Sequence, residues 1–222
     1  MERFAIAIDG PAGSGKSTAA KETAKRLGMV YVDTGAMYRT VALACMRAGV
    51  SVSDEAAALS VLNRIDMRIE PEQGGQRIFL DGKDVTAEIR TPEIGKGASE
   101  VAAFPKVRER LVEIQQELAR KYPVVMDGRD IGTVVLPDAE LKIYLDAGVE
   151  ERARRRQGEL REQGKTEELS EVMEKIRQRD EADKTREHSP LRMANDAISL
   201  DSTRMSAEEV VQAILAEAEK LR

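Results

Sequence analysis

The chain has 222 residues, a formal net charge of −5 and a single cysteine. Its length suits one α/β domain with insertions. A hydrophobic content of 41% supports a packed core and argues against a disordered chain. The negative charge argues against a general nucleic-acid-binding surface, which needs clustered basic residues. No apolar stretch reaches the length of a membrane span, so we expect neither nucleic acid nor a membrane as a partner.

The scarcity of cysteine and histidine argues against several kinds of site. Cys45 has no second cysteine with which to form an internal disulfide, which fits a reducing cytosol and predicts a cytoplasmic protein. Its position in a predicted helix favours a role in the core. His188 is the only histidine, which argues against a His-based zinc site or a Ser-His-Asp triad.

The most specific motif follows the first apolar run, Phe4–Ile8, which predicts a buried strand. It has the G-x-x-x-x-G-K-S pattern of a phosphate-binding loop between a strand and a helix. Its glycines let backbone amides turn toward a phosphate, and the N-terminus of the next helix attracts the same anion. Lys16 adds a charge at the β- and γ-phosphates, and the Ser17 hydroxyl can hold Mg²⁺. The predicted nucleoside triphosphate site consists of Gly10, Pro11, Ala12, Gly13, Ser14, Gly15, Lys16, Ser17 and Thr18.

Strands and helices then alternate as far as residue 65. The spacing of apolar residues predicts a helix over Lys16–Leu27, ended by Gly28, and a short buried strand over Met29–Val32. An amphipathic helix follows from Met37 to Ala48, and Ser53 is the expected N-cap of another helix that ends near residue 64.

The pattern changes after residue 65. Met67 and Ile69 alternate with charged residues, as Ile78 and Leu80 do, and Gln73–Gln76 lies between them as a turn. This alternation predicts an exposed β-hairpin with one packed face. Because the hairpin interrupts an α/β alternation, we expect a small inserted subdomain over residues 66–103.

The rest of the chain returns to strands and helices around one heavily charged segment, residues 149–188. Strands are predicted over Val124–Met126, Leu141–Leu145 and Ala197–Leu200, and helices over Phe104–Lys121 and Val210–Leu221. With the first two strands this order predicts a mostly parallel, five-stranded sheet covered by helices on both faces. We expect one domain over residues 1–222, whose core comprises about residues 1–65, 104–148 and 189–222.

Two further polar clusters follow predicted strands, where open parallel sheets bind their ligands. The segments 33–35 and 127–130 would place Thr34, Arg129 and Asp130 beside the phosphate-binding loop. Asp33 or Thr34 could instead cap the next helix. Capping does not account for the adjacent pair Arg129 and Asp130, which predicts a second ligand at this edge of the sheet.

The charged segment contains a helical stripe that changes from apolar to ionic. Burial of ionic side chains is costly without partners, so we expect the ionic half to face a phosphorylated ligand; an ordinary solvated surface is the alternative. The stripe, spaced three or four residues apart, consists of Leu169, Val172, Ile176, Arg179, Asp183 and Arg186. The same two interpretations, ligand contact or surface ion pairs, stay open for Arg152, Arg154, Arg155 and Arg156.

Five segments in this order resemble the bacterial cytidylate kinase family over nearly the whole chain. They are the phosphate-binding loop and residues 33–39 (Asp-Thr-Gly-Ala-Met-Tyr-Arg), 97–108 (Gly-Ala-Ser-Glu-Val-Ala-Ala-Phe-Pro-Lys-Val-Arg), 128–133 (Gly-Arg-Asp-Ile-Gly-Thr) and 179–186 (Arg-Asp-Glu-Ala-Asp-Lys-Thr-Arg). The resemblance implies a nucleoside monophosphate kinase fold, in which the insertion binds the monophosphate and residues 149–188 form a mobile lid and the helix after it.

The resemblance also implies roles for residues at matching positions. Arg39, Arg129 and Arg186 would hold the monophosphate of CMP; Thr34, Arg108 and Asp130 would contact the base; Ser99, Arg179 and Asp183 would lie near the ribose. Cytosine chemistry agrees, because a carboxylate such as Asp130 can accept a hydrogen bond from N4 while Arg108 can serve N3 and O2.

The expected reaction is phosphorylation of CMP or dCMP by MgATP, with Lys16, Arg129 and Arg186 as catalytic residues. We expect a monomer that acts on these small molecules. Two alternatives remain: a kinase of the same architecture that acts on UMP or AMP, and a GTP-binding switch or non-catalytic ATP-binding module. The sequence contains no Asn-Lys-x-Asp guanine-reading segment, which disfavours the switch.

Overall fold

The computed structural model describes residues 4–72, 75–162 and 164–221. Within these ranges, five parallel strands form one sheet in the order β2-β6-β1-β7-β8. The strands are β1 (Ala5–Asp9), β2 (Val30–Asp33), β6 (Val124–Gly128), β7 (Leu141–Asp146) and β8 (Ile198–Asp201). The predicted five-stranded parallel core is confirmed, with strand ends shifted by one or two residues.

Helices cover both faces of this sheet, which explains why its central strands are continuous apolar runs. One face packs against α1 (Lys16–Leu27) and α8 (Ala207–Glu219). The other packs against α5 (Pro105–Lys121) and the short π-helix η2 (Ile131–Val135). In β1, Ile6 and Ile8 enter the first layer and Ala7 the second, as the two-residue period of a strand requires.

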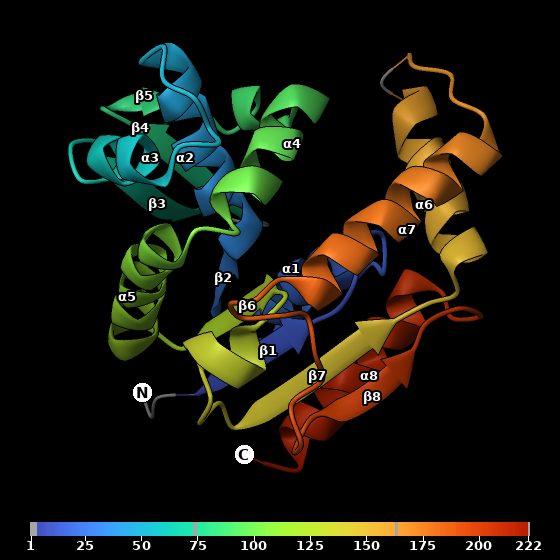
Figure 1. The fold of residues 1–222 in the computed structure, drawn as a ribbon. Helices are drawn as coiled ribbons and strands as arrows, with labels where there is room; N and C mark the ends of the chain where they lie inside the picture. Colours follow the sequence, from blue (N-terminus) through green and yellow to red (C-terminus); the bar gives the residue numbers. More distant parts are fainter. Residues whose placement is uncertain (1–3, 73–74, 163, 222) are drawn as a thin grey trace.

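A lobe stands on the β2 side of the sheet (Figure 1). It consists of α2 (Thr34–Arg47), α3 (Glu55–Leu62), β3 (Met67–Glu72), β4 (Gly75–Leu80), β5 (Lys83–Asp84), η1 (Glu88–Arg90) and α4 (Pro92–Val101). The hairpin of β3 and β4 is confirmed, and its buried side packs on α2 and α3. Gln73 and Gly74 of the predicted turn lie outside the described residues. The third strand, β5, was not predicted, and the limits of the insertion stay a prediction.

The predicted helix that begins after Ser53 is shorter and starts one residue later. Asp54 is the N-cap, because its carboxylate accepts a 3.0 Å hydrogen bond from the amide of Ala57. Ser53 instead donates its hydroxyl to Glu100, at 2.6 Å. Cys45 is fully buried in α2, as predicted.

A helical arm rises on the β7–β8 side of the sheet and consists of α6 (Val149–Glu162) and α7 (Leu169–Thr185). Its helices pack around Ala153, Leu160, Val172 and Ile176. The prediction that Arg186 continues the stripe of α7 is wrong, because the helix ends at Thr185 and Arg186 has an extended backbone. The chain reverses there, and the amide of Leu191 donates to the carbonyl of Asp183 at 2.7 Å.

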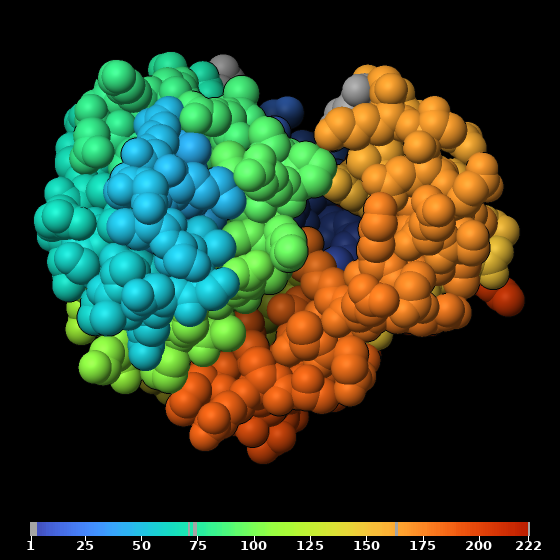
Figure 2. Space-filling model, turned by 45° about the horizontal axis from the view of Figure 1, so that its top comes forward, coloured from blue at the N-terminus to red at the C-terminus, as the bar shows by residue number. Residues whose placement is uncertain are grey.

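The space-filling view shows a deep hollow between the lobe and the arm (Figure 2). The blue N-terminal segment forms its floor. This is the edge at which the parallel strands end, so the hollow opens over the phosphate-binding loop. In the described ranges, no helix is both long and apolar enough to cross a membrane.

Candidate active site

The phosphate-binding loop leaves β1 and enters α1 through a tightly packed turn. A Cβ on Gly10 would collide with the carbonyl oxygen of Leu145 in the neighbouring strand β7, so only glycine fits there. Gly15 is the N-cap of α1 with a φ of 87°, a conformation that favours glycine. These two positions explain the glycines of the motif by packing and backbone geometry.

Lys16 lies buried at the start of α1, under the hollow. Its Nζ donates a 3.0 Å hydrogen bond to the carbonyl of Pro11 within the loop. Burial and the neighbouring charge of Arg129 lower the pKa of Lys16 from 10.5 to about 7, and Arg179 acts in the same direction. The charges of Lys16, Arg129 and Arg179 therefore act on one another, which favours binding of a polyanion between them.

Ser17 and Asp127 provide oxygen atoms beside the loop. The Ser17 hydroxyl donates a 2.7 Å hydrogen bond to Asp127 Oδ2, and the Tyr31 hydroxyl donates to Oδ1 at 2.9 Å. Burial and the neighbouring charge of Asp33 raise the pKa of Asp127. A hydroxyl and a carboxylate suit Mg²⁺, which takes few protein oxygens and shares the rest of its shell with phosphates and water. Asp127 was missing from the predicted site residues, although its place after an aliphatic strand was a usable signal.

A buried cluster forms the wall that the sequence assigns to the base. Arg108 in α5 makes an ion pair with Asp130 and donates to the carbonyl of Ala102 at 3.0 Å. Its guanidinium also lies over the ring of Tyr38, 5.3 Å from the centroid. Thr34 donates its hydroxyl to the carbonyl of Asp127 at 2.8 Å. The structure thus brings Thr34, Arg108 and Asp130 to one side of the hollow.

Asp33 caps α2, which is one of the two predicted alternatives, and it also holds two arginines. Its Oδ1 accepts the amide of Ala36 at 2.9 Å, and its Oδ2 lies 3.6 Å from Arg39 and 2.8 Å from Arg90. Burial acts to raise the pKa of Asp33, but the two arginines outweigh it and hold that pKa below its ordinary value. Arg90 was not predicted, because nothing in its local sequence distinguishes it from other surface arginines.

Arg129 and Arg186 meet at a shared carboxylate from the arm. Asp183 Oδ2 accepts a 2.7 Å hydrogen bond from Arg129 Nε, and its Oδ1 lies 4.0 Å from Arg186. Arg186 is also 3.9 Å from Asp130, and its Nε donates to the carbonyl of Ser189 at 2.6 Å. Burial opposes ionisation of Asp183, but Arg129 outweighs it and holds the pKa of this carboxyl low.

Two predicted residues are less closely engaged. Arg179 is exposed on α7, although its charge reaches Lys16 and Arg129 across the hollow. Ser99 is exposed on α4, and its hydroxyl donates to the carbonyl of Gly95 in the same helix at 3.3 Å. Among the described residues, no hydrogen bond or ion pair joins either side chain to Asp183, although the charge of Arg179 lowers the pKa of that carboxyl.

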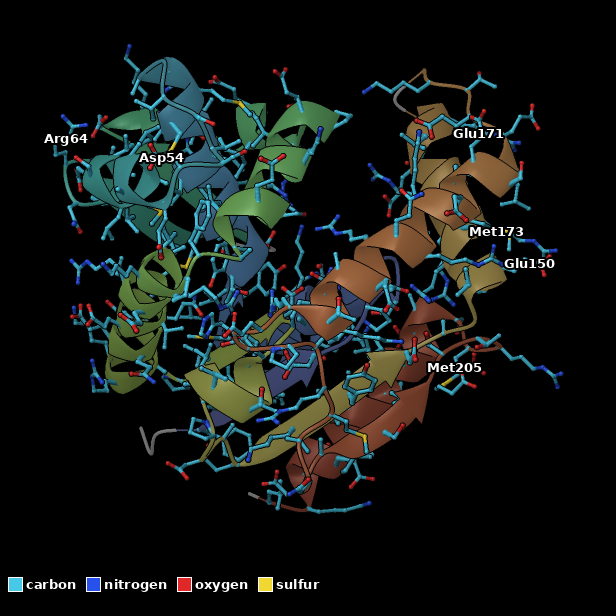
Figure 3. The ribbon with its side chains drawn as sticks, viewed as in Figure 1. Asp54, Arg64, Glu150, Glu171, Met173 and Met205 are labelled. Atoms are coloured by element: carbon cyan, nitrogen blue, oxygen red, sulfur yellow. The ribbon has the colours of Figure 1, made fainter. Side chains whose placement is uncertain are left out.

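The four clustered arginines of α6 divide into two pairs. Arg154 and Arg156 form ion pairs with Glu150 and Glu159 on the surface, and Glu150 lies on the outer side of the arm (Figure 3). Arg152 and Arg155 instead face the phosphate-binding loop. Arg152 donates to the carbonyl of Ala12 at 3.0 Å and to Asp180 of α7 at 2.6 Å.

Arg155 donates to the carbonyls of Ser14 and Ser202, at 3.3 and 2.7 Å. Arg155 also pairs with Glu151 at 3.0 Å, as the ion-pair interpretation predicts. The contacts by which the inner pair ties the root of the arm to the loop were not predicted.

Replacing Arg152 by alanine is expected to destabilise the protein by about 3–5 kcal/mol, because Asp180 would be left buried without a partner. Asp180 and Arg152 are 6% and 4% exposed. Arg154→Ala is the matched control on the same helix and should leave the urea midpoint almost unchanged, since its ion pair is exposed. Equal urea midpoints for the two variants would contradict the assignment.

The phosphate-binding loop faces a second wall, lined with arginines, across one hollow. This arrangement is that of a P-loop kinase. Solved structures with a similar fold agree with this fold class. A shikimate kinase from Bacteroides thetaiotaomicron superposes with a TM-score of 0.50 at 16% identity, over 97% of this chain and 98% of that one. An uncharacterised protein from Eubacterium ventriosum gives a TM-score of 0.52 at 10% identity, with the same coverage. At these identities the likeness shows the fold alone.

The family model for cytidylate kinase matches residues 6–220. The chain is 51% identical over 215 residues to a cytidylate kinase of Caldicellulosiruptor bescii, covering 97% of this chain and 95% of the relative. It is 50% identical to one of Bacillus thuringiensis, covering 96% and 95%. The chain belongs to the cytidylate kinase family, whose members are nucleoside monophosphate kinases.

Proposed function

We propose that the protein transfers the γ-phosphoryl group of MgATP to CMP or dCMP and releases ADP with CDP or dCDP. The observation that supports this most directly is a set of unsatisfied donors on the acceptor wall. Arg39 Nη1, Arg108 Nε and Arg186 Nη2 are buried and find no hydrogen-bond partner among the described residues. Buried donors without partners are costly, and a nucleotide phosphate and a cytosine ring supply the missing acceptors.

The residues beside the loop fit Mg²⁺. Ser17 and Asp127 would hold the ion, directly or through water, together with phosphate oxygens of the donor. Bound there, Mg²⁺ neutralises charge on the β- and γ-phosphates. The hydroxyl and carboxylate already lie 2.7 Å apart, so little rearrangement is needed to present both oxygens.

The chain's own contribution to catalysis is positioning and charge neutralisation. Phosphoryl transfer has a loose transition state that needs little covalent help, and the acceptor phosphate is already anionic at neutral pH, so no general base is required. Lys16 holds the transferred group from the donor side, while Arg39, Arg129 and Arg186 hold the CMP phosphate opposite it. Closure of the arm excludes water, which otherwise competes as the acceptor.

Steady-state ADP production with CMP, dCMP, UMP and AMP as acceptors tests this function. CMP and dCMP should accelerate ADP release strongly, and UMP and AMP much less. Slow hydrolysis that ignores CMP would instead indicate a switch or an ATP-binding module. A preference for UMP or AMP would identify a related kinase.

Substitution of Asp183, assigned to the sugar, and of Arg186, assigned to the phosphate, should change kcat/KM in different ways. Asp183→Ala is expected to bring the kcat/KM values for CMP and dCMP closer together, because the carboxylate is assigned to the ribose. Arg186→Ala should weaken both substrates alike by tenfold or more, since a lost charge-assisted contact costs about 1.5–3 kcal/mol. Near-wild-type kinetics in both variants would mean that this part of the arm is ordinary surface.

We also propose that the protein acts as a monomer in the cytoplasm. The buried and unpaired Cys45 fits a reducing compartment. Size-exclusion chromatography with light scattering tests the oligomeric state, for which a mass near 24.5 kDa is expected.

A further inference from the structure

Asp9, the last residue of β1, joins two segments that are distant in the sequence. One carboxylate oxygen accepts the amide of Ile131 at 2.8 Å, and the other accepts the amide of Gly132 at 2.8 Å. The side chain is 5% exposed. The carboxylate therefore satisfies two buried donors at the start of η2, 122 and 123 residues away along the chain.

Each end of this connection leads directly into one half of the active site. Gly10, which follows Asp9, begins the phosphate-binding loop and packs closely against the carbonyl oxygen of Leu145. Arg129 and Asp130 immediately precede Ile131, and the carbonyl of Asp130 accepts the amide of Val134 at 2.9 Å. The Asp9 carboxylate thus lies between the loop for the donor phosphates and the segment that carries two acceptor-side residues.

Asp9 keeps a carboxylate at a place where ionisation is costly. Burial raises the pKa of Asp9 from 3.8 to about 6 in spite of the two amide donors, so ionisation at this place is unfavourable for stability. An asparagine would avoid the cost of a buried charge. It offers only one acceptor oxygen, however, and directs an NH₂ group at the second amide. Only an ionised carboxylate accepts both amides and fixes the segment at two adjacent points.

We propose that Asp9 is a positioning residue that sets Arg129 and Asp130 at a fixed place relative to the phosphate-binding loop. It thereby aligns the CMP phosphate with the γ-phosphate of ATP. This inference rests on the proposed function. Misalignment of reacting groups by about 1 Å can reduce the rate of a reaction about 10²-fold, so a small displacement of this segment has a measurable effect.

The test is Asp9→Asn, measured with ATP and CMP varied separately. We expect KM for CMP to rise about tenfold and kcat to fall about 10- to 100-fold, while KM for ATP changes less than about twofold. Asp54→Asn is the matched control, because Asp54 also accepts a backbone amide but lies in the lobe, at the N-cap of α3 (Figure 3). The control should lower the melting temperature without separating the two KM values.

A second variant approaches the same junction from the other side. A Cβ on Gly132 would lie 3.2 Å from Lys142 Cδ, a tight contact, and 3.5 Å from Asp9 Oδ2, an ordinary one, so Gly132→Ala crowds the segment against Lys142 where it meets Asp9. It should raise KM for CMP in the same direction by a smaller factor, and it keeps the test decisive if Asp9→Asn folds poorly.

The outcomes separate this inference from the function itself. Wild-type protein that does not phosphorylate CMP would overturn the proposed function. Wild-type activity combined with unchanged CMP kinetics in the variants would overturn the role of Asp9 alone. Equal increases in KM for ATP and CMP, or a loss of thermal stability with wild-type kinetics, would also overturn it.

Discussion

Replacing Lys16 by alanine is expected to reduce kcat by about 10²–10³-fold, the range seen when one preorganised charge-stabilising donor is removed. Nζ lies at the loop that holds the β- and γ-phosphates, and its one hydrogen bond goes to the loop carbonyl of Pro11. The side chain supports no other element, so the fold should remain. Lys25→Ala, an exposed lysine in the same helix, is the control for the ADP assay.

The stability of the Lys16→Ala variant gives a second, independent result. The pKa of Lys16 lies near 7 in the folded protein, below its ordinary 10.5. Between these values the unfolded chain binds more protons than the folded one, so Lys16 makes wild-type stability rise with pH across this window. The loss of stability that comes from burying the charged form of Lys16 is full below about pH 7 and absent above about pH 10.5.

The unfolding free energy of wild type should therefore increase relative to that of the variant as pH rises from 7 to 10. Urea unfolding at several pH values measures it. A difference that is independent of pH would contradict the perturbed state of Lys16.

Asp130→Asn is expected to reduce the preference for CMP over UMP by about 5- to 150-fold, equivalent to ~1–3 kcal/mol of discrimination. The carboxylate is proposed to accept from N4 of cytosine, whereas uracil presents an acceptor oxygen at that position. An asparagine amide can turn its NH₂ toward that oxygen. Asparagine is preferable to alanine here, because Arg108 is 4% exposed and would otherwise lose its buried partner.

Competition between CMP and UMP at fixed ATP measures this preference directly. Asp138→Asn, the same change at an exposed position, is the control and should leave the ratio unchanged. An unchanged ratio in Asp130→Asn, with activity toward both nucleotides reduced alike, would assign Asp130 to holding Arg108 and not to reading the base.

The features that sequence predicted well are those determined by neighbouring residues. The aliphatic run before Gly10 and the lysine after Gly15 specify a strand, a turn and a helix without distant contacts. Gly28 and Gly49 both have positive φ and mark the ends of α1 and α2 as expected. The sheet could be predicted because buried parallel strands are short apolar runs with helices between them.

The parts that escaped prediction depend on contacts between distant segments. Arg129 and Asp183 are 54 residues apart, and Arg152 and Asp180 are 28 apart, so no local spacing identifies either pair. The predicted helical stripe was wrong at Arg186, because the periodicity of a helix does not indicate where the helix ends. Asp9 was not among the predicted site residues, since its two partners are backbone amides, which carry no sequence signal.

The arm is tied to the sheet at two neighbouring strands. It leaves β7 through Ala147, whose carbonyl accepts from Arg152 at 2.8 Å, and it returns to β8 past Asp196, which Lys142 of β7 holds at 2.6 Å. We expect the arm, which has its own apolar cluster and attaches at two neighbouring strands, to move as one body about this attachment. Its outer end, near residues 164–168, would then move farthest, while Arg152 beside the attachment would keep its contact with the loop. On this expectation, substrate binding changes the angle of the arm and not its internal packing.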